Sequence, residues 1–422
     1  METLKVIRLG CVGLGGRGQS QMREMMSVPG VTVAACCDKH LDRAEAAAKS
    51  AAALQEEPPA VYTNYKELLA RTDIDAILCC STWITHARIA IDSMRAGKDV
   101  AIEVGGAASV EECWRMVRAS EETGKVCMLL ENCCYDRKEM ALFRMVREGL
   151  FGEIVHLEGG YRHDLREEIC YGRENRHGRL PNFIARNGEL YPTHQLGPIA
   201  KMIGINRGNR FLTLCSLASK SRGLRVFVQK REGAEYHLAN TRFNCGDVVS
   251  TTITCANGET IHLTHDCSLP RPYSRAYMIE GTNGIFQEAP FGNAIYLEDN
   301  SPPDTGWDHT WERFEDTYLP RYEHPLWDRY RAQGIHAGGH GGMDFLVCSA
   351  FIRALQTGTP PPIDVYDTAA WMVITCLSEQ SVAMGGAPVP IPDFTNGAWI
   401  EREPFARTAF CLEDICEECF CN

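Results

Sequence analysis

Three glycines near the amino terminus have the spacing of a turn that binds nucleotides. Gly13, Gly15 and Gly18 fit the pattern G-x-G-x-x-G, with an apolar run before them and a helical pattern after them. Such glycines let the backbone approach a pyrophosphate, and the amino terminus of the following helix supplies N–H donors and positive potential. A glycine motif alone is weak evidence, but this order of strand, turn and helix is the one that the chemistry requires. We therefore expect a dinucleotide site here.

A carboxylate stands at the end of the next apolar run. Asp38 follows Gly18 by 20 residues, the place from which an acidic side chain binds the ribose hydroxyls of a dinucleotide. Its charge would repel a 2′-phosphate, so the sequence favours NAD over NADP. Lys39 and Arg43 beside it weaken that preference.

A tyrosine and a histidine form a second candidate site. The stretch Tyr191-Pro192-Thr193-His194 is typical of a helix start, because proline suits the first helical turn. Tyr191 and His194 are three residues apart and can share a face. The positive end of the helix dipole disfavours an imidazolium, so we expect a neutral His194 that can accept a proton. A capping or core histidine is the alternative, since a lone histidine is more often structural.

The composition limits the partners and the compartment. The 422 residues include 43 Lys and Arg against 55 Asp and Glu, a net charge of −12. Without a basic excess, neither a nucleic acid nor an anionic membrane is an expected partner. No apolar run is long enough for a membrane span, and no secretory signal is recognised. The 20 cysteines are scattered and suit small core filler better than a disulfide framework, so a cytoplasmic protein is expected.

The first part of the chain must hold the glycine turn. Apolar runs alternate with helical patterns, which indicates a parallel, doubly wound sheet. We expect a Rossmann-type NAD-binding domain over residues 1–150. The predicted strands are residues 6–12, 31–37, 77–80, 100–104 and 126–130.

The rest of the chain has a different pattern. Many candidate strands are joined by turn signals, which predicts an α+β domain with a mainly antiparallel sheet over residues 151–422. Helical patterns cover residues 342–355 and 366–383, while residues 164–190 and 299–335 resemble long loops, which often line a site. The predicted strands are residues 154–161, 211–217, 226–228, 247–255, 260–265, 277–281 and 284–287.

The two parts together resemble the Gfo/Idh/MocA oxidoreductases, and several stretches are similar to glycoside hydrolase family 109, the NAD-dependent N-acetylgalactosaminidases. This resemblance extends over nearly the whole chain, and Tyr-Pro-Thr-His and Arg-Pro-Tyr-Ser-Arg are its most specific parts. The stretches that carry it are residues 103–104, 128–132, 160–166, 187–194, 271–275 and 339–344.

The resemblance implies NAD as cofactor, a small glycoside as substrate, no metal and a homo-oligomer. It also implies positions for both ligands. The implied NAD contacts are Gly16, Arg17, Asp38, Trp83, His86, Glu103, Val104, Asn132 and Tyr191. The implied sugar contacts are Tyr161, Arg179, Tyr191, His194 and Tyr273.

One contrast inside the superfamily separates two classes of enzyme. Its sugar and inositol dehydrogenases usually carry Glu-Lys-Pro at the end of a strand, and the lysine assists hydride transfer from a hydroxyl. This chain has Glu103-Val104-Gly105 instead. A dehydrogenase would need another acid–base residue here, whereas a glycosidase that uses tyrosine and histidine would not.

The chain also departs from the family pattern. Gly105 stands where proline is expected, Gln195 stands where glycine is expected, and residues 81–84 lack a proline and a second tryptophan. These positions are expected near the cofactor or the sugar, so the preferred sugar and its anomer stay open.

By the same resemblance, hydrolysis proceeds through transient oxidation at sugar carbon 3, loss of the carbon 2 proton, elimination and addition of water. His194 is predicted to take the proton of the carbon 3 hydroxyl, and Tyr161 or Tyr191 to take the carbon 2 proton. Arg179 would favour a tyrosinate or bind the sugar, and Glu103 would orient the sugar. Two alternatives stay open: a sugar dehydrogenase or 3-keto-sugar enzyme that releases reduced cofactor, and a non-catalytic NAD-dependent sensor.

Three further groups of residues have both a structural and a functional interpretation. His336, His340 and Asp344 have the spacing of metal ligands, but the intervening glycines favour a pocket or capping role. The tail thiols include a Cys-x-x-Cys pair but no separated second pair, so incidental thiols are expected. Aromatic residues from Trp307 to Tyr330 suit sugar stacking, packing on the sheet or a subunit contact. The tail thiols are Cys411, Cys416, Cys419 and Cys421.

Overall fold

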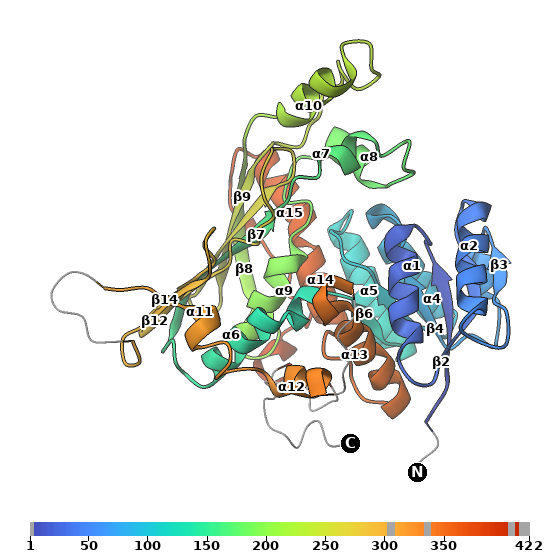
Figure 1. Ribbon diagram of the computed structural model, residues 1–422, viewed down its shortest axis with the longest axis horizontal. Helices are drawn as coiled ribbons and strands as arrows, with labels where there is room; N and C mark the ends of the chain where they lie inside the picture. Colours follow the sequence, from blue (N-terminus) through green and yellow to red (C-terminus); the bar gives the residue numbers. More distant parts are fainter. Residues whose placement is uncertain (1–3, 302–308, 333–338, 404–409, 413–422) are drawn as a thin grey trace. The chain divides into compact units, whose positions relative to one another are not determined.

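The computed structural model describes residues 4–301, 309–332, 339–403 and 410–412 (Figure 1). They form two compact units. The first unit draws on residues 1–137, 325–369 and 403–422, and the second on residues 138–324 and 370–402.

The first unit is built on a six-stranded parallel sheet with the order β3-β2-β1-β4-β5-β6. This order confirms the predicted doubly wound Rossmann sheet. Among its helices, α1 packs against α13 and α4 packs against α5. The strands are β1 (Ile7–Val12), β2 (Val31–Cys37), β3 (Ala60–Tyr62), β4 (Ala76–Cys79), β5 (Asp99–Ile102) and β6 (Cys127–Leu129). The helices include α1 (Gly16–Met26), α2 (Leu41–Ala52), α3 (Tyr65–Leu69), α4 (Trp83–Arg95), α5 (Val110–Thr123), η1 (Asn132–Tyr135), α12 (Pro325–Ala332) and α13 (Met343–Thr357).

Cysteine fills much of this sheet. Cys11 and Cys36 are register partners on β1 and β2, and both are fully buried. Burial raises the pKa of the Cys36 thiol to about 12, so it stays protonated. The described cysteines are all free thiols, which confirms their predicted use as core filler.

The second unit contains a nine-stranded sheet with the order β14-β13-β12-β11-β7-β10-β9-β8-β15. All its pairs are antiparallel except β7 with β10, so the predicted mainly antiparallel sheet is confirmed. The strands are β7 (Ile154–Arg162), β8 (Phe211–Ala218), β9 (Val249–Cys255), β10 (Thr260–Asp266), β11 (Met278–Gly281), β12 (Gly284–Gln287), β13 (Ala294–Leu297), β14 (Glu312–Arg313) and β15 (Val389–Pro390). The helices include α6 (Arg137–Arg147), α7 (Arg166–Cys170), α8 (Arg179–Ala185), α9 (Thr193–Met202), α10 (Gly223–Glu232), α11 (Phe314–Thr317) and α15 (Ile374–Ala383).

One predicted strand is wrong. Residues 226–228 lie inside helix α10. The Asp247 carboxylate accepts the backbone N–H groups of Arg222 and Gly223 at 2.7 and 3.0 Å, which satisfies donors at the start of this helix. Three apolar residues are too short a pattern to distinguish a strand from one turn of a buried helix face.

Two other expectations need refinement. The expected loop at residues 164–190 contains α7 and α8, and the one at residues 299–335 contains β14, α11 and α12. The helical pattern at residues 366–383 is divided at Val373 into α14 (Val365–Met372) and α15. Among the described helices, none combines the length and apolar character needed to cross a membrane.

The compact units divide the chain differently from the domains expected in the sequence. Most of α6 groups with the second unit although it precedes residue 150, and residues 325–369 group with the first. Helix α13 explains part of this grouping, because it packs against α1 and η1. The boundary at residue 150 stays a prediction about domain organisation.

Candidate active site

The glycine turn has the backbone that the sequence predicts. Gly13 has a φ of +86°, and a Cβ atom there would lie 2.5 Å from the backbone nitrogen of Ser81. A Cβ atom on Gly18 would lie 1.9 Å from the carbonyl oxygen of Gly13. Both positions therefore require glycine. Around Gly16, by contrast, a Cβ atom would meet nothing within 4 Å.

The start of α1 can receive an anion. Its N-cap is Gly15, which has no side chain to accept the first N–H groups, and the first turn holds no acidic residue. These N–H groups and the helix dipole suit a pyrophosphate. The open space at Gly16 and the glycines required by the fold therefore fit a dinucleotide.

Asp38 has a structural task that the sequence did not reveal. Its Oδ2 accepts the backbone N–H of Leu14 at 2.7 Å, and its Oδ1 accepts that of His40 at 2.9 Å. The carboxylate thus braces the glycine turn from the end of β2. Because a carboxylate has about four lone-pair sites, both oxygens can still accept ribose hydroxyls.

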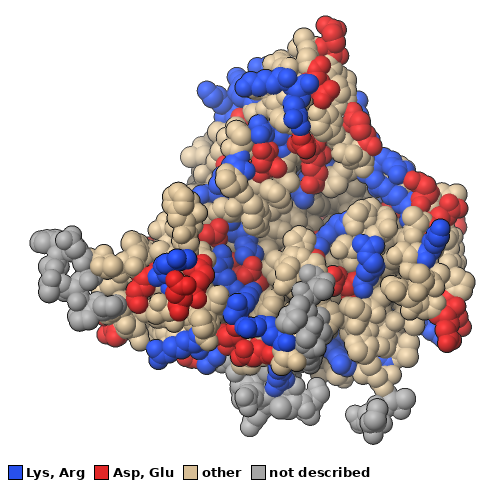
Figure 2. All heavy atoms as spheres, in the orientation of Figure 1, with Lys and Arg blue, Asp and Glu red and all other residues tan. Residues whose placement is uncertain are grey.

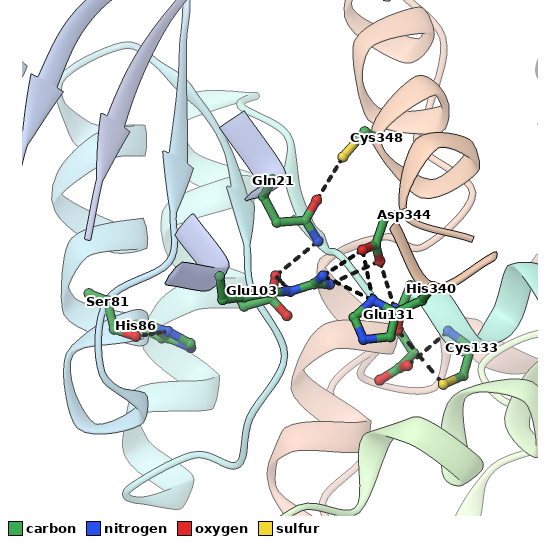
Figure 3. Close-up of polar contacts among 11 residues, drawn as sticks. Gln21, Ser81, His86, Glu103, Glu131, Cys133, His340, Asp344 and Cys348 are labelled. Carbon is green, nitrogen blue, oxygen red and sulfur yellow. Dashed lines mark hydrogen bonds and ion pairs between the residues drawn. The ribbon is translucent and has the colours of Figure 1, made fainter. Parts of the chain in front are cut away.

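Arg17 lies at the centre of an ionic cluster in the first unit. Figure 3 labels its members Glu103, His340 and Asp344. Its Nε atom is 3.1 Å from Oε2 of Glu103, and its Nη1 and Nη2 donate to Asp344 at 2.5 and 3.0 Å. Asn132 Nδ2 donates to Oδ1 of Asp344 at 2.7 Å, and His340 Nδ1 lies 2.8 Å from its Oδ2. We call these five residues the ionic cluster. It brings together three of the predicted NAD contacts, Arg17, Glu103 and Asn132.

The ionic cluster favours the charged forms of Arg17 and Asp344. Burial would raise the pKa of Asp344, but hydrogen bonds from His340 and Arg17 hold that pKa well below its usual range. Burial would likewise lower the pKa of Arg17, but Glu103 and Asp344 hold it above its usual range. His340 and Asp344 are thus within hydrogen-bond distance of each other, their expected pocket or capping role stays a prediction, and His336 lies outside the described residues.

Glu103 also connects the ionic cluster to α13. Its Oε2 accepts Gln21 Nε2 at 3.1 Å, and Gln21 Oε1 lies 3.0 Å from the thiol of Cys348. Val104 next to it is buried. The role of Glu103 in orienting the sugar stays a prediction.

The structure accounts for Gly105, which replaces the expected proline. Its φ is +153°, and a Cβ atom there would lie 2.3 Å from the Trp83 ring. Proline fixes φ near −65° and could not adopt this backbone. Glycine therefore makes room for Trp83 at the start of α4.

His86 lies in the same helix turn as Trp83 but apart from the ionic cluster (Figure 3). Its Nε2 is 2.8 Å from the carbonyl oxygen of Ser81. Burial lowers the pKa of His86 to about 4, so it is a neutral donor to the loop after β4. Its predicted contact with NAD stays a prediction.

The second unit gathers the predicted sugar-binding residues. Tyr161 lies on β7 and His194 in the first turn of α9, with Tyr191 just before that helix. The ring centroids are 4.5 Å apart for Tyr161 and Tyr191, 5.3 Å for Tyr161 and His194, and 4.8 Å for Tyr191 and His194. Both tyrosines are buried. We call these three residues the aromatic cluster. Whether Tyr191 also contacts NAD stays a prediction.

A cation lies against the aromatic cluster. The Arg179 guanidinium stands 5.0 Å from the centroid of the Tyr191 ring, and its Nε is 2.6 Å from Oε1 of Glu168. Burial opposes its charge, but Tyr161 and Glu168 hold the pKa of Arg179 above its usual range. Tyr273 completes the predicted set at 6.3 Å from Tyr161, with half of its surface exposed.

His163 is a member of this site that sequence reasoning missed. Its Nδ1 lies 3.1 Å from the hydroxyl oxygen of Tyr161, and its ring centroid lies 5.0 Å from that of Tyr273. The available signal was its position two residues after Tyr161, because residues i and i+2 of an extended chain share a face.

The side chain of Gln195, which replaces the expected glycine, is accommodated beside Gly159. It is fully buried, and a Cβ atom on Gly159 would lie 1.9 Å from its Cγ. Its amide lies 3.5 Å from Glu139, which is 3.3 Å from Arg275. Gly159 on β7 thus leaves the space that this glutamine occupies.

The remaining aromatic and thiol signals are mostly structural or undescribed. Tyr318, Tyr322, Trp327 and Tyr330 are buried, which favours packing, while Trp311 is half exposed. Cys411 is buried. Trp307, Cys416, Cys419 and Cys421 lie outside the described residues.

Known proteins share both parts of the chain. Residues 7–130 match the oxidoreductase family with an NAD-binding Rossmann fold, and residues 135–401 match the C-terminal domain of glycosyl hydrolase 109. An alpha-N-acetylgalactosaminidase of Tannerella forsythia is 42% identical over 94% of this chain and 88% of its own length. A second one, of Shewanella oneidensis, is 39% identical over 95% of this chain and 88% of its own length.

The fold has solved counterparts as well. Levoglucosan dehydrogenase in complex with NADH covers 92% of this chain and 100% of its own, with a TM-score of 0.66 and 18% identity. At that identity the likeness concerns the fold alone, and it is the fold of an NAD-binding oxidoreductase. The two sequence matches decide the family: the chain belongs to glycosyl hydrolase family 109 and carries an NAD-binding Rossmann domain.

Proposed function

We propose that the chain hydrolyses small N-acetylgalactosaminides by transient oxidation at sugar carbon 3, elimination across carbons 1 and 2, and addition of water. The observation that carries this proposal is the aromatic cluster with its adjacent arginine, in a glycosidase that also has a dinucleotide turn. Most glycosidases place two carboxylates around the scissile bond, but NAD-dependent glycosidases are an exception. A site of Tyr161, Tyr191, His194 and Arg179 suits that exception.

The first unit holds the cofactor. N–H groups at the start of α1 bind the pyrophosphate, and Asp38 accepts ribose hydroxyls while it braces the turn. NAD held there would supply a hydride acceptor for carbon 3 and, once reduced, a hydride donor for the last step. Val104 offers no ammonium group where the related dehydrogenases usually have lysine, which favours the glycosidase over the dehydrogenase.

The second unit moves the protons. A ring nitrogen of His194 takes the proton of the carbon 3 hydroxyl, and the hydroxyl oxygen of Tyr161 or Tyr191 takes the carbon 2 proton. The positive charge of Arg179, 5.0 Å from the Tyr191 ring, favours a tyrosinate and binds sugar oxygens. General acid–base groups of this kind contribute about 10²- to 10⁴-fold to a rate.

Turnover of aryl glycosides in D₂O tests this function. A panel of nitrophenyl glycosides, with the α-N-acetylgalactosaminide first, should be hydrolysed without net absorbance of NADH, and the product should carry deuterium at carbon 2. A thioglycoside should also be cleaved, because elimination does not need protonation of the leaving atom. Stoichiometric NADH would instead identify a dehydrogenase. Tight NAD binding without turnover of any glycoside would identify a sensor.

The compartment and the assembly are part of the proposal. Buried free thiols support the reducing cytoplasm. Leu217 on β8 and Val155 on β7 are more than half exposed, which supports a contact between copies through this sheet. The net charge of −12 and the intermixed basic and acidic side chains on the visible face (Figure 2) give no support to a nucleic-acid partner. Light scattering of the purified protein measures its oligomeric state.

A further inference from the structure

His163 holds a position from which it can serve Tyr161. Tyr161 precedes Arg162, the last residue of β7, His163 follows directly after the strand, and the hydroxyl oxygen of Tyr161 lies 3.1 Å from Nδ1 of His163. The rings meet edge to face, with centroids 5.6 Å apart. The backbone N–H of His163 donates to the carbonyl oxygen of Asp266 at 3.0 Å, which fixes the main chain below the ring. Tyr161 thus has a ring nitrogen beside its hydroxyl.

The surroundings of His163 keep its imidazole neutral. Burial lowers the pKa of His163, and the positive charge of Arg179 on α8 lowers it further. His194 on α9 acts in the same direction, while Glu168 on α7 and Asp164 in the adjoining loop oppose it. Tyr273 covers another side of the ring. With its proton on Nε2, the neutral ring offers Nδ1 as an acceptor for the phenolic hydrogen.

We propose that His163 is the proton partner of Tyr161 and that Tyr161 is the group that deprotonates carbon 2. The assignment rests on the proposed redox and elimination route. In this step the carbon 2–hydrogen bond breaks, its electron pair forms the enolate of the 3-keto sugar, and the proton passes to the hydroxyl oxygen of Tyr161. The phenolic proton moves at the same time to Nδ1 of His163. The imidazolium that forms is stabilised by Glu168 and Asp164, and it returns its proton when carbon 2 is reprotonated.

Two substitutions separate proton transfer from positioning. His163→Asn places an amide atom near the position of Nδ1 and can keep a hydrogen bond to Tyr161, but it cannot take a proton. His163→Phe keeps the ring packing and removes the nitrogen. We expect both variants to lose about 100-fold in kcat, with circular dichroism and NAD affinity unchanged. His262→Asn, a histidine substitution on β10 of the same sheet, is the matched control and should retain wild-type kcat.

The proton step itself is followed with a substrate deuterated at carbon 2. In the His163 variants the isotope effect on kcat/KM should grow, while the single-turnover absorbance of NADH keeps its amplitude, because oxidation at carbon 3 precedes the slowed step. The acid side of the pH profile should lose one ionisation. In a Tyr161→Phe background, His163→Asn should cause no further loss, because His163 acts through Tyr161.

The outcomes distinguish this inference from the function on which it rests. If the wild type exchanges no deuterium at carbon 2, the redox and elimination route fails and the role of His163 fails with it. If the wild type exchanges deuterium but the His163 variants keep kcat within twofold, or lose it equally in the Tyr161→Phe background, the role of His163 alone is overturned. Loss of the NADH signal in the variants would also overturn it, because the defect would then lie before carbon 2.

Discussion

The ionic cluster of the first unit and the aromatic cluster of the second unit are built from different kinds of side chain. In the ionic cluster, Arg17 forms ion pairs with Glu103 and Asp344, and the contact between Arg17 and Asp344 favours the charged form of both residues. In the aromatic cluster, the rings of Tyr161, Tyr191 and His194 lie within 5.3 Å of one another beside a single cation. Fixed charges are suited to hold structure in place, whereas phenols and imidazoles can exchange protons near neutral pH. We therefore expect the ionic cluster to stabilise the fold of the first unit and the aromatic cluster of the second unit to exchange protons with the substrate.

The strongest way to break this contrast is to remove the proton acceptor of the aromatic cluster. His194→Asn should lower kcat by about 10³-fold, because a general base contributes roughly 10²- to 10⁴-fold. Stability and NAD affinity should change little. Steady-state turnover of an aryl glycoside and isothermal titration with NAD measure the two effects. A variant that keeps more than a tenth of the wild-type kcat would remove His194 from the chemistry.

Removal of a charge from the ionic cluster should have the reverse effect. Asp344→Asn leaves the buried end of Arg17 without its closest counter-charge. It should cost about 2 to 3 kcal/mol of unfolding free energy in urea, less than a fully buried pair because Arg17 is partly exposed. Asp73→Asn breaks an exposed Arg–Asp pair of the same unit and should cost less than about 1 kcal/mol. Equal costs for the two variants would show that the ionic cluster does not hold the fold.

Acid should destabilise both units through buried neutral histidines. The pKa is lowered by burial to about 4 for His86 in the first unit and to about 3 for His265 in the second. A histidine with a depressed pKa stabilises the fold above its unfolded value, about 6.5, and that stability is lost as the pH falls toward the folded value. Unfolding free energy should fall by about 2 kcal/mol per such histidine between pH 7 and pH 5. In His86→Gln, urea titrations at the two pH values should show a smaller loss than in wild type, and an unchanged loss would exclude His86 as a cause.

The smallest effect tests how closely a ligand approaches the glycine turn. In Gly16→Ala the new Cβ atom meets nothing in the protein, so the stability without NAD should be unchanged. A pyrophosphate at the start of α1 would meet that atom, and NAD affinity should fall on the order of tenfold, about 1.4 kcal/mol. Ser50→Ala on α2 is the control and should bind NAD normally. Unchanged binding by Gly16→Ala would move the pyrophosphate away from this turn.

The parts of the fold that could be predicted from the sequence are those that depend on local residue patterns. Five strands of the parallel sheet, the glycine turn and the helix that starts near His194 follow from apolar runs and from glycine and proline at defined positions. The three-residue strand β3 (Ala60–Tyr62) was missed, because so short a run has no clear period. The strand expected at residues 226–228 is wrong, because Asp247 helps to start a helix there by accepting the N–H groups of Arg222 and Gly223, which precede it by 25 and 24 residues. The bracing of the turn by Asp38 was equally hidden, since nothing in its position shows which N–H groups it accepts.

The two clusters also differ in how far apart their residues lie in the sequence. Tyr191 and His194 lie in one short motif, and His163 could have been found from its spacing to Tyr161. The bond between Arg17 and Asp344 joins residues separated by 327 positions, and no local rule connects them. Gly105 became intelligible only through the ring of Trp83, which occupies the space of its missing side chain.

That long separation also sets an order of events during synthesis on the ribosome. The sheet and the glycine turn of the first unit are complete early in the chain, but the carboxylate that pairs with Arg17 emerges only after strands β7 to β14 of the nine-stranded sheet have been made. Until then, Arg17 and Glu103 face each other without Asp344, and the surface of α1 that α13 covers stays exposed. Closing such a long loop is slow compared with local folding. The nascent first unit therefore lacks α13 through most of translation. During this period it is most exposed to chaperones and to aggregation.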